Sequence, residues 1–326
     1  MFRSALTKVD MADSPSAGRI LVTPRSLTQG DLDSIAELQP LRIAGYELVS
    51  APAGRTPTED DLLALAPGCV GWLAGVERIP ASVLAAATDL RMIARNGVGT
   101  DNVDMAAAAG AGVAVTTATG ANAQGVAELA LTLALVCLRQ VPWSSAAVRS
   151  GGWDRWPAKE VSEITVGIVG LGAIGRKVKA AFSALGATVI GYDPYTSAEG
   201  IRLVGLDDLV ASADVVTLHA PPPDDGSALI DAARLARFSE GAILVNTARA
   251  SLVDDRALLA ALEEGRLSAY AVDAFETEPP EVTPLLLHSR VIATPHLGAY
   301  TSASVSRATT MAVNSLLKNL KDLENG

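Results

Sequence analysis

Cysteine, histidine and aromatic residues are all scarce in this chain. Its 326 residues include 2 cysteines, 3 histidines and only 4% aromatic side chains. Cys69 and Cys137 each lie in an apolar run, which predicts two inert buried thiols, with a single disulfide as the less favoured alternative. No C-x-x-C pair or histidine-rich cluster occurs, so the sequence predicts no bound metal.

Long apolar runs and excess positive charge are missing too. The most apolar stretch, 126–138, is too short for a membrane span of about 20 residues, and it contains Glu128. The first 18 residues are polar and hold no apolar core of signal-peptide length, so we expect a ragged N-terminus and a soluble, cytoplasmic protein. The formal net charge of -10 disfavours nucleic acid as a partner, because an acidic chain repels polyphosphate.

What the chain does have is enough apolar side chain for two domains, since 49% of it is hydrophobic. Short apolar runs alternate with helical periods in its first part. Strands alternating with helices at this spacing predict a parallel sheet covered on both faces. The predicted strands are 20–22, 46–49, 70–73, 92–94 and 113–115, and the predicted helices are 31–38, 59–66, 80–87 and 103–109.

A second alternating region follows a long predicted helix, 121–148, and a loop rich in glycine and tryptophan, 151–157. It contains six strand candidates, the number in a full doubly wound dinucleotide domain. They are 165–169, 188–192, 215–219, 243–246, 269–272 and 291–294, and further helices are predicted at 254–264 and 301–320. The fold class is therefore α/β, with two doubly wound parallel sheets.

The strongest local motif is a glycine-rich turn, G-x-G-x-x-G, formed by Gly170, Gly172 and Gly175. An apolar strand precedes it and a helical period follows. In that context the glycines permit a tight turn, close approach of a pyrophosphate and close packing of the helix on the strand. Asp193, at the end of the next strand, is placed to receive ribose hydroxyls and to repel a 2′-phosphate, which favours NAD over NADP. The alternative is a glycine-rich turn that binds nothing.

Three further residues follow later strands and suit hydride transfer to a 2-keto acid. His296 can protonate the carbonyl oxygen, Glu278 can stabilise the resulting imidazolium, and the planar guanidinium of Arg249 can bind a substrate carboxylate. Taken alone, each of these three residues could have a structural role instead of a catalytic one. Of the other two histidines, His288 is interpreted as a helix end, and His219 as a residue that lines the cofactor crevice or caps the third strand.

Seven motifs occur in the order found in one family: RNGVGTDNVD, NAQGVAELAL, VGIVGLGAIG, HAP, NTAR, VDAFETEP and TPHLG. On these motifs the chain resembles the D-isomer-specific 2-hydroxyacid dehydrogenases, which include phosphoglycerate dehydrogenases. The resemblance implies a Rossmann NAD domain at 118–298 inserted into a flavodoxin-like substrate domain formed by 1–117 and 299–326. It also implies catalysis in a cleft that closes about a hinge, and a homodimer formed with help from the long helix.

Residue roles follow from the same resemblance. Arg249, Glu278 and His296 match the family's catalytic residues, and Asp273 matches the acid that contacts the nicotinamide carboxamide. The backbone of Gly97 and Val98 is expected to bind the substrate carboxylate, with Ala74, Gly75, Asn122 and Arg249 also facing the substrate. The remaining residues expected to line NAD are Ala173, Ile174, His219, Ala220, Pro221, Thr247 and Ala248.

Two departures from the family pattern stand out. Ala250 replaces the usual glycine after the catalytic arginine, and it would carry strain if that position needed a positive φ. The loop 74–76 lacks the arginine and serine often present in phosphoglycerate-oxidising relatives, which weakens the assignment of phosphoglycerate as the substrate.

The predicted reaction is NAD-linked hydride transfer at the 2-position of a small D-2-hydroxy or 2-keto acid. Two alternatives stay open: an NAD-binding co-repressor-like scaffold, or a dehydrogenase of an unusual oxyanion such as phosphite, formate or a phosphonate.

Overall fold

The computed structural model describes residues 17–196 and 200–324, which form two compact units. Unit one comprises the described parts of Met1–Ala121 and Val305–Gly326, and unit two is Asn122–Ser304. The boundaries therefore lie at 121/122 and 304/305, where the sequence predicted 117/118 and 298/299. The expected ragged N-terminus concerns residues 1–18, of which 1–16 lie outside the described residues.

Unit one is built on a parallel sheet of five strands in the order β2-β1-β3-β4-β5. This is the flavodoxin-like order, in which the direction of strand addition reverses between β1 and β3. Each of the five predicted strands is present, with its ends within two residues of the prediction. The strands are β1 (Gly18–Val22), β2 (Tyr46–Ser50), β3 (Cys69–Ala74), β4 (Met92–Arg95) and β5 (Ala114–Thr117).

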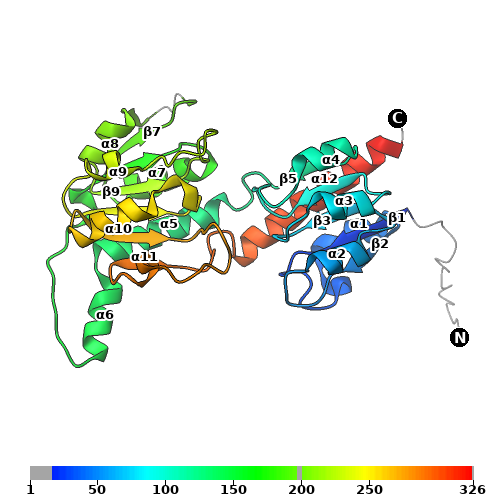
Figure 1. Cartoon of the computed structure of the whole chain (residues 1–326), viewed down its shortest axis with the longest axis horizontal. Coiled ribbons are helices and arrows are strands. Elements are labelled where there is room, and N and C mark those ends of the chain that lie inside the picture. The colour runs from blue at the N-terminus through cyan, green and yellow to red at the C-terminus, as the bar shows by residue number, and fades with distance from the viewer. Residues whose placement is uncertain (1–16, 197–199, 325–326) are drawn as a thin grey trace, which may run out of the picture. The chain divides into compact units, whose positions relative to one another are not determined.

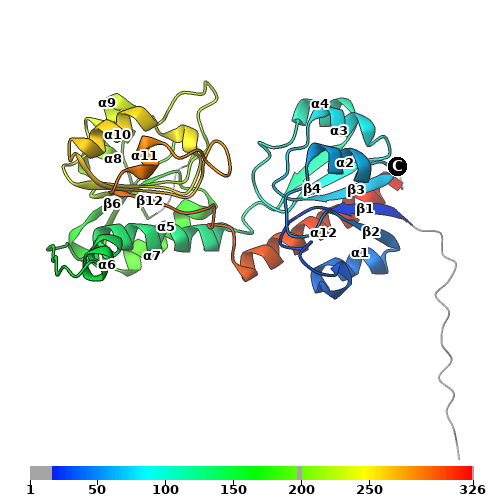
Figure 2. The same cartoon turned by 60° about the horizontal axis from the view of Figure 1, so that its bottom comes forward.

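Helices cover both faces of this sheet (Figure 2). One face packs against α2 (Glu59–Leu65), α3 (Ala81–Ala86) and α4 (Met105–Gly110). The other packs against α1 (Gln39–Ile43) and the part of α12 (Ser302–Glu324) that belongs to unit one.

The prediction of one helix at 31–38 was wrong. That segment forms two 3-10 turns, Leu32–Ser34 and Ala36–Leu38, separated by an extended Ile35. The Asp31 carboxylate accepts a hydrogen bond from the N–H of Asp33, and the Ser34 hydroxyl donates to the Asp31 carbonyl oxygen. Such local bonds compete with the regular helical ladder, so the continuous helix does not form.

Unit two contains a parallel sheet of seven strands in the order β12-β11-β10-β9-β6-β7-β8. All six predicted strands are present, and the order reverses between β6 and β9, as in a Rossmann domain. The seventh, β8, was missed because it has only two residues, both exposed, and therefore lacks an apolar run. The strands are β6 (Thr165–Val169), β7 (Thr188–Tyr192), β8 (Arg202–Leu203), β9 (Val215–Leu218), β10 (Ala242–Asn246), β11 (Leu267–Val272) and β12 (Val291–Ala293).

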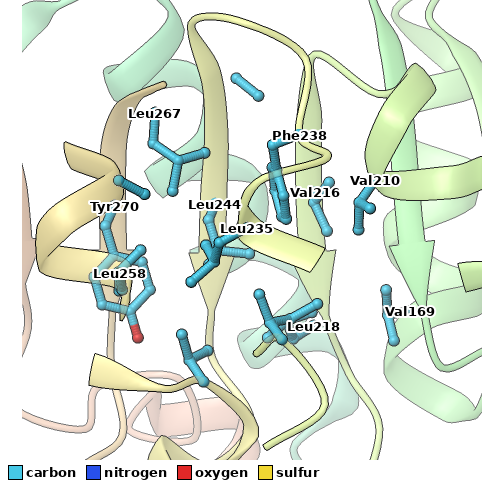
Figure 3. Packing of buried hydrophobic residues seen from close by; sticks show 14 of the residues in the cluster. Val169, Val210, Val216, Leu218, Leu235, Phe238, Leu244, Leu258, Leu267 and Tyr270 are labelled. Atoms are coloured by element: carbon cyan, nitrogen blue, oxygen red, sulfur yellow. The ribbon is translucent and has the colours of Figure 1, made fainter. Parts of the chain in front are cut away.

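Each face of the unit-two sheet has its own apolar core. Helices α5 (Ala123–Leu138) and α7 (Ala173–Ala184) pack on one face (Figure 2). The opposite face is covered by α8 (Leu206–Ser212), α9 (Ala232–Leu235), α10 (Asp255–Glu263) and α11 (Pro284–Leu287). Figure 3 shows the second core, where Leu218 and Leu244 of the sheet pack with Leu235 and Leu258 of the helices.

The long predicted helix 121–148 is broken into two, which corrects the prediction. It forms α5 and α6 (Val141–Arg149), with a bend of 56° between them. Gln140 at the break has a left-handed φ of 52°. Pro142 has no N–H to donate to the carbonyl of Leu138, so the α-helical ladder cannot continue through this point. Figure 1 shows α6 and the chain after it extending away from the sheet of unit two.

Among the described residues no single helix is long and apolar enough to cross a membrane. Only the bent pair α5 and α6 taken together meets the length and composition test. Helix α5 lies in the core of unit two, where Leu133, Ala134 and Cys137 are buried.

Candidate active site

The glycine-rich turn lies at the point where the strand order of unit two reverses. Gly170 follows β6 and has a φ of 90°, which favours glycine. A Cβ at Gly170 would lie 2.7 Å from backbone atoms of both His219 and Ala220, at the end of β9. The turn therefore lies directly against the end of β9.

The other two glycines have different surroundings. A Cβ on Gly175 would lie 2.0 Å from the carbonyl oxygen of Gly170, so no side chain fits there and α7 packs directly on the turn. A Cβ on Gly172 would meet no atom within 4 Å, so its backbone borders open space at the N-terminus of α7, where Ala173 and Ile174 form the first helical residues. Free N–H groups at such a helix start favour a phosphate.

Two buried polar atoms beside the turn have no protein partner within residues 17–196 and 200–324. They are Nδ1 of His219, after β9, and Oγ1 of Thr247, after the neighbouring strand β10. His219 Nε2 lies 2.9 Å from the hydroxyl of Thr217, and burial lowers the pKa of His219 to about 3, so its ring is neutral near pH 7. Orphaned buried polar atoms at this edge fit a polar ligand that completes their hydrogen bonding.

Asp193 reaches back to the glycine-rich turn from the end of β7. Its carboxylate accepts hydrogen bonds from the N–H of Leu171 at 2.8 Å and of Tyr195 at 2.9 Å. The acid is thus held beside the turn at the distance along the chain that the motif predicted. The open edge at Gly172, the orphaned polar atoms and this carboxylate together fit a dinucleotide.

Arg249 lies on a turn that a buried asparagine organises. The Asn246 amide donates to the carbonyl oxygen of Arg249 at 2.8 Å, and its oxygen accepts the N–H of Ala248 at 3.1 Å. Asn246 is fully buried at the end of β10, so the turn has a rigid base. Ala250 begins a 3-10 turn without a positive φ, so the alanine carries no left-handed strain and the departure from glycine is tolerated.

Asp273 anchors the segment that carries the catalytic histidine. It follows β11 and is 2% exposed. Its carboxylate accepts hydrogen bonds from the Thr294 hydroxyl at 2.6 Å and from the N–H groups of Leu297 at 2.7 Å and Gly298 at 2.8 Å. The resemblance implied a contact to the nicotinamide for this acid, whereas the anchoring role comes only from the structure.

His296 and Glu278 form a hydrogen-bonded pair after β12 and β11. His296 Nδ1 lies 2.7 Å from Glu278 Oε1, and both side chains are partly exposed. The backbone of His296 has a left-handed φ of 53°, a conformation that costs energy for a side chain with a Cβ. The three bonds to Asp273 on either side of it hold this strained position.

The structure places the predicted residues of unit two at one edge of one sheet. Gly170, His219, Arg249, Asp273 and His296 follow β6, β9, β10, β11 and β12, and all the strand pairs are parallel. Pro221 lies exposed beyond His219, and Asn122 directly precedes α5. No group of three or more His, Cys, Asp or Glu side chains in the described ranges is close enough to hold a metal ion.

Sequence reasoning missed the close packing of the first turn of α5 on the histidine segment. A Cβ on Gly125 would lie 2.8 Å from the carbonyl oxygen of Gly298. The signal was available in part, because glycine inside a helical pattern often marks a close approach of backbone.

In unit one the predicted substrate residues lie after β3 and β4. The N–H groups of Gly97 and Val98 donate to no acceptor in the described part of the chain, so both are available to an anion. Arg95 lies next to them, 6% exposed, and donates from Nε to the carbonyl oxygen of Gly99 at 3.0 Å. Ala74 ends β3, and Gly75 follows it.

Residues 131–298 match the model of the D-isomer specific 2-hydroxyacid dehydrogenase, NAD binding domain. A D-3-phosphoglycerate dehydrogenase of Mycobacterium tuberculosis is 42% identical over 268 residues, which is 80% of this chain and 51% of that protein. The chain belongs to the D-isomer-specific 2-hydroxyacid dehydrogenase family. It spans about half the length of the curated relatives it matches.

Solved structures agree with this membership of the 2-hydroxyacid dehydrogenases. The TT0316 protein from Thermus thermophilus is 33% identical with a TM-score of 0.84, covering 93% of this chain and 97% of that one. A glyoxylate reductase from Paecilomyes thermophila is 26% identical with a TM-score of 0.81, covering 94% and 96%. The predicted fold class and NAD as the cofactor are confirmed, and the family's NAD-binding domain falls within unit two.

Proposed function

We propose that this chain is an NAD-dependent oxidoreductase that transfers a hydride between nicotinamide and the 2-position of a small D-2-hydroxy or 2-keto acid. The observation that supports this most directly is the His296–Glu278 pair at 2.7 Å, which lies at the carboxyl edge of the sheet that carries the glycine-rich turn. The cofactor, when bound, supplies or accepts the hydride. The residues of the chain handle the proton and the charge.

His296 is proposed as the general acid for reduction of the keto acid and as the general base in the reverse direction. Because its Nδ1 is engaged by Glu278, the ring presents Nε2 for transfer of a proton to the substrate oxygen. The Glu278 carboxylate orients the ring and stabilises its protonated form. Arg249 is proposed to bind the substrate carboxylate and polarise the carbonyl through its planar guanidinium. The free N–H groups of Gly97 and Val98 are proposed as further donors to that carboxylate.

The test is reduction of a panel of 2-keto acids, including glyoxylate, pyruvate and hydroxypyruvate, followed by NADH and NADPH absorbance. We expect turnover with NADH, and His296→Ala should lower kcat by about 10²–10⁴-fold because it removes the acid. His288→Ala is the matched control, since His288 only ends α11 and accepts the N–H of Arg290. Absence of turnover with every keto acid would overturn the proposal.

A homodimer that uses α6 and the following chain is part of this proposal. Helix α6 buries none of its own residues, and Val148 is 55% and Trp153 77% exposed. Trp143 at its base is held by a hydrogen bond to the carbonyl oxygen of Ser289 and by Arg290, 4.9 Å from the ring centre. An apolar, anchored projection suits a second copy of the chain, because symmetric dimers bury the same patch on both partners.

Light scattering tests the dimer. We expect the native mass to be twice that of one chain and Trp153→Glu to shift it toward the monomer. Leu203→Glu, on the exposed edge strand β8, is the control and should leave the mass unchanged. A monomeric native protein would refute the dimer.

A cytoplasmic location also stays a prediction. The two free, buried cysteines are compatible with a reducing compartment, and cell fractionation would test the location.

A further inference from the structure

A buried carboxyl group lies at the ligand-binding edge of unit one. The strand order there reverses between β1 and β3, and in open α/β sheets the crevice for ligands lies beyond the carboxyl ends of the strands at such a point. Glu77 lies three residues past the end of β3 and is 1% exposed. A charged side chain this buried needs partners, and its partners all come from the strand ends.

Glu77 takes up the hydrogen-bond donors that follow β1 and β3. Its Oε1 accepts the N–H of Gly75 at 2.9 Å and the hydroxyl of Thr23, which follows β1. The indole of Trp72 donates to the same hydroxyl at 2.9 Å, so the hydroxyl is fixed in place. Backbone N–H and hydroxyl donors at strand ends are the groups that bind external anions. Here the chain's own carboxyl group occupies them.

Arg95 ties the neighbouring turn to the end of β3. It ends β4, and its Nη1 donates to the carbonyl oxygen of Ala74 at 3.3 Å, while Nε donates to the carbonyl oxygen of Gly99. Burial raises the pKa of Glu77, and the hydrogen bond from Thr23 and the attraction of Arg95 oppose that shift only in part. The guanidinium thus bonds both to the end of β3, next to Gly75, and to the turn that carries Gly97 and Val98.

The same arrangement leaves no room for a recognition side chain at position 75. A Cβ on Gly75 would lie 2.7 Å from Glu77 Oε2 and 2.9 Å from Cα of Pro24. The Pro24 contact is with backbone, which cannot move aside like the end of a flexible chain. The loop 74–76 consequently offers neither a cation nor a hydroxyl to a second anionic group of a substrate.

We propose that Glu77 is a specificity-determining residue. Its carboxyl group occupies the donors of Gly75 and Thr23, to which a second anionic group of a substrate would otherwise bind. It thereby restricts the substrate to 2-keto or 2-hydroxy acids with one carboxylate and no phosphate. This inference rests on the proposed function. It separates the chain from the activity named for its mycobacterial relative, because a phosphate placed here would meet a carboxyl group instead of donors.

The first experiment tests occupancy of the anion position without any activity measurement. Glu77→Ala removes the shorter bonds of the Gly75 N–H and the Thr23 hydroxyl and leaves them bonds of 3.2 Å to Thr23 Oγ1 and to the Leu73 carbonyl oxygen, so its thermal midpoint should fall. Sodium formate should restore part of that loss, whereas sodium chloride at equal ionic strength should not. Glu77→Gln keeps an acceptor oxygen, and Glu47→Ala changes an exposed acid on β2 of the same unit; neither should respond to formate. A Glu77→Ala protein that melts identically in formate and chloride would overturn the proposal.

The second experiment compares hydroxypyruvate with 3-phosphohydroxypyruvate, which differ only by the phosphate. The native enzyme should prefer the unphosphorylated acid in kcat/KM by at least about 100-fold, because Glu77 already occupies the Gly75 N–H and the Thr23 hydroxyl that would otherwise bind a phosphate. Glu77→Ala, which frees these donors, should narrow that preference by about tenfold. Equal use of both acids by the native enzyme would refute the assignment. If no keto acid is reduced at all, the proposed function has failed, and the formate comparison still decides the role of Glu77.

Discussion

Replacement of Asp273 by alanine should release the segment that carries His296. The carboxylate of Asp273 is almost fully buried and accepts three hydrogen bonds, from Thr294, Leu297 and Gly298. Each donor left without a partner costs about 1–3 kcal/mol. The Thr294 hydroxyl keeps a second acceptor in the Val272 carbonyl oxygen at 3.3 Å, so the two N–H groups decide the cost. Relief of the left-handed backbone at His296 returns about 1 kcal/mol, so we expect a net loss of about 1–5 kcal/mol.

Native-state hydrogen exchange is the suitable assay, because it reports opening of this segment separately from unfolding of either unit. Amides of Leu297 and Gly298 should exchange about 100-fold faster in Asp273→Ala, the factor that corresponds to about 3 kcal/mol, the middle of that range. Asp254→Ala is the control. It removes one hydrogen bond at the start of α10 and should cost about 1 kcal/mol without affecting these amides.

The reasoning would be refuted if Asp273→Ala left exchange at Leu297 and Gly298 unchanged. That result would mean that the strained turn at His296 is held by other contacts. A loss of kcat without faster exchange would instead favour direct contact of Asp273 with the cofactor, the role that the resemblance implied.

Three further predictions concern residues of unit two. Gly172→Ala should fold normally and bind NADH more weakly, whereas Gly175→Ala should fold poorly because its Cβ meets Gly170, as melting and NADH titration would show. The stability of the native protein should fall by about 1.4 kcal/mol per pH unit as pH falls from about 6.5 toward about 3, because the pKa of His219 is lowered in the folded state only. His219→Gln should abolish this loss, and identical pH slopes for the two proteins would contradict the prediction. Cys137, whose pKa burial raises to about 12, should react with a thiol reagent only after unfolding.

The sequence predicted those parts of the fold that follow from local pattern. Apolar runs located the major strands, and the glycine-rich turn located the edge of the unit-two sheet at which the candidate residues were expected to meet. The two-residue strand β8 gave no signal because hydrogen bonding to β7 alone defines it. The break between α5 and α6 could have been predicted, because Pro142 was visible in a helical pattern.

For the site, sequence reasoning named residues and roles but not the contacts that hold them. His296 and Glu278 were paired in advance because their chemistry requires each other. The anchoring by Asp273 and the filling of the unit-one edge by Glu77 depend on donors from distant chain segments, and neither partner carries a motif. Asn246 was interpreted as the end of a strand, and its role in shaping the Arg249 turn depends on a side chain that folds back onto its own loop.

Helix α12 has a consequence for the order of assembly. Its side chains Val313, Leu316 and Leu320 complete one face of the unit-one core, and a Cβ on Gly71 of β3 would lie within 3.2 Å of both leucines. During synthesis almost all of unit two emerges before this helix does. The sheet of unit one therefore lacks this cover for about 180 residues of translation, and in that time it must avoid aggregation or be protected by a chaperone.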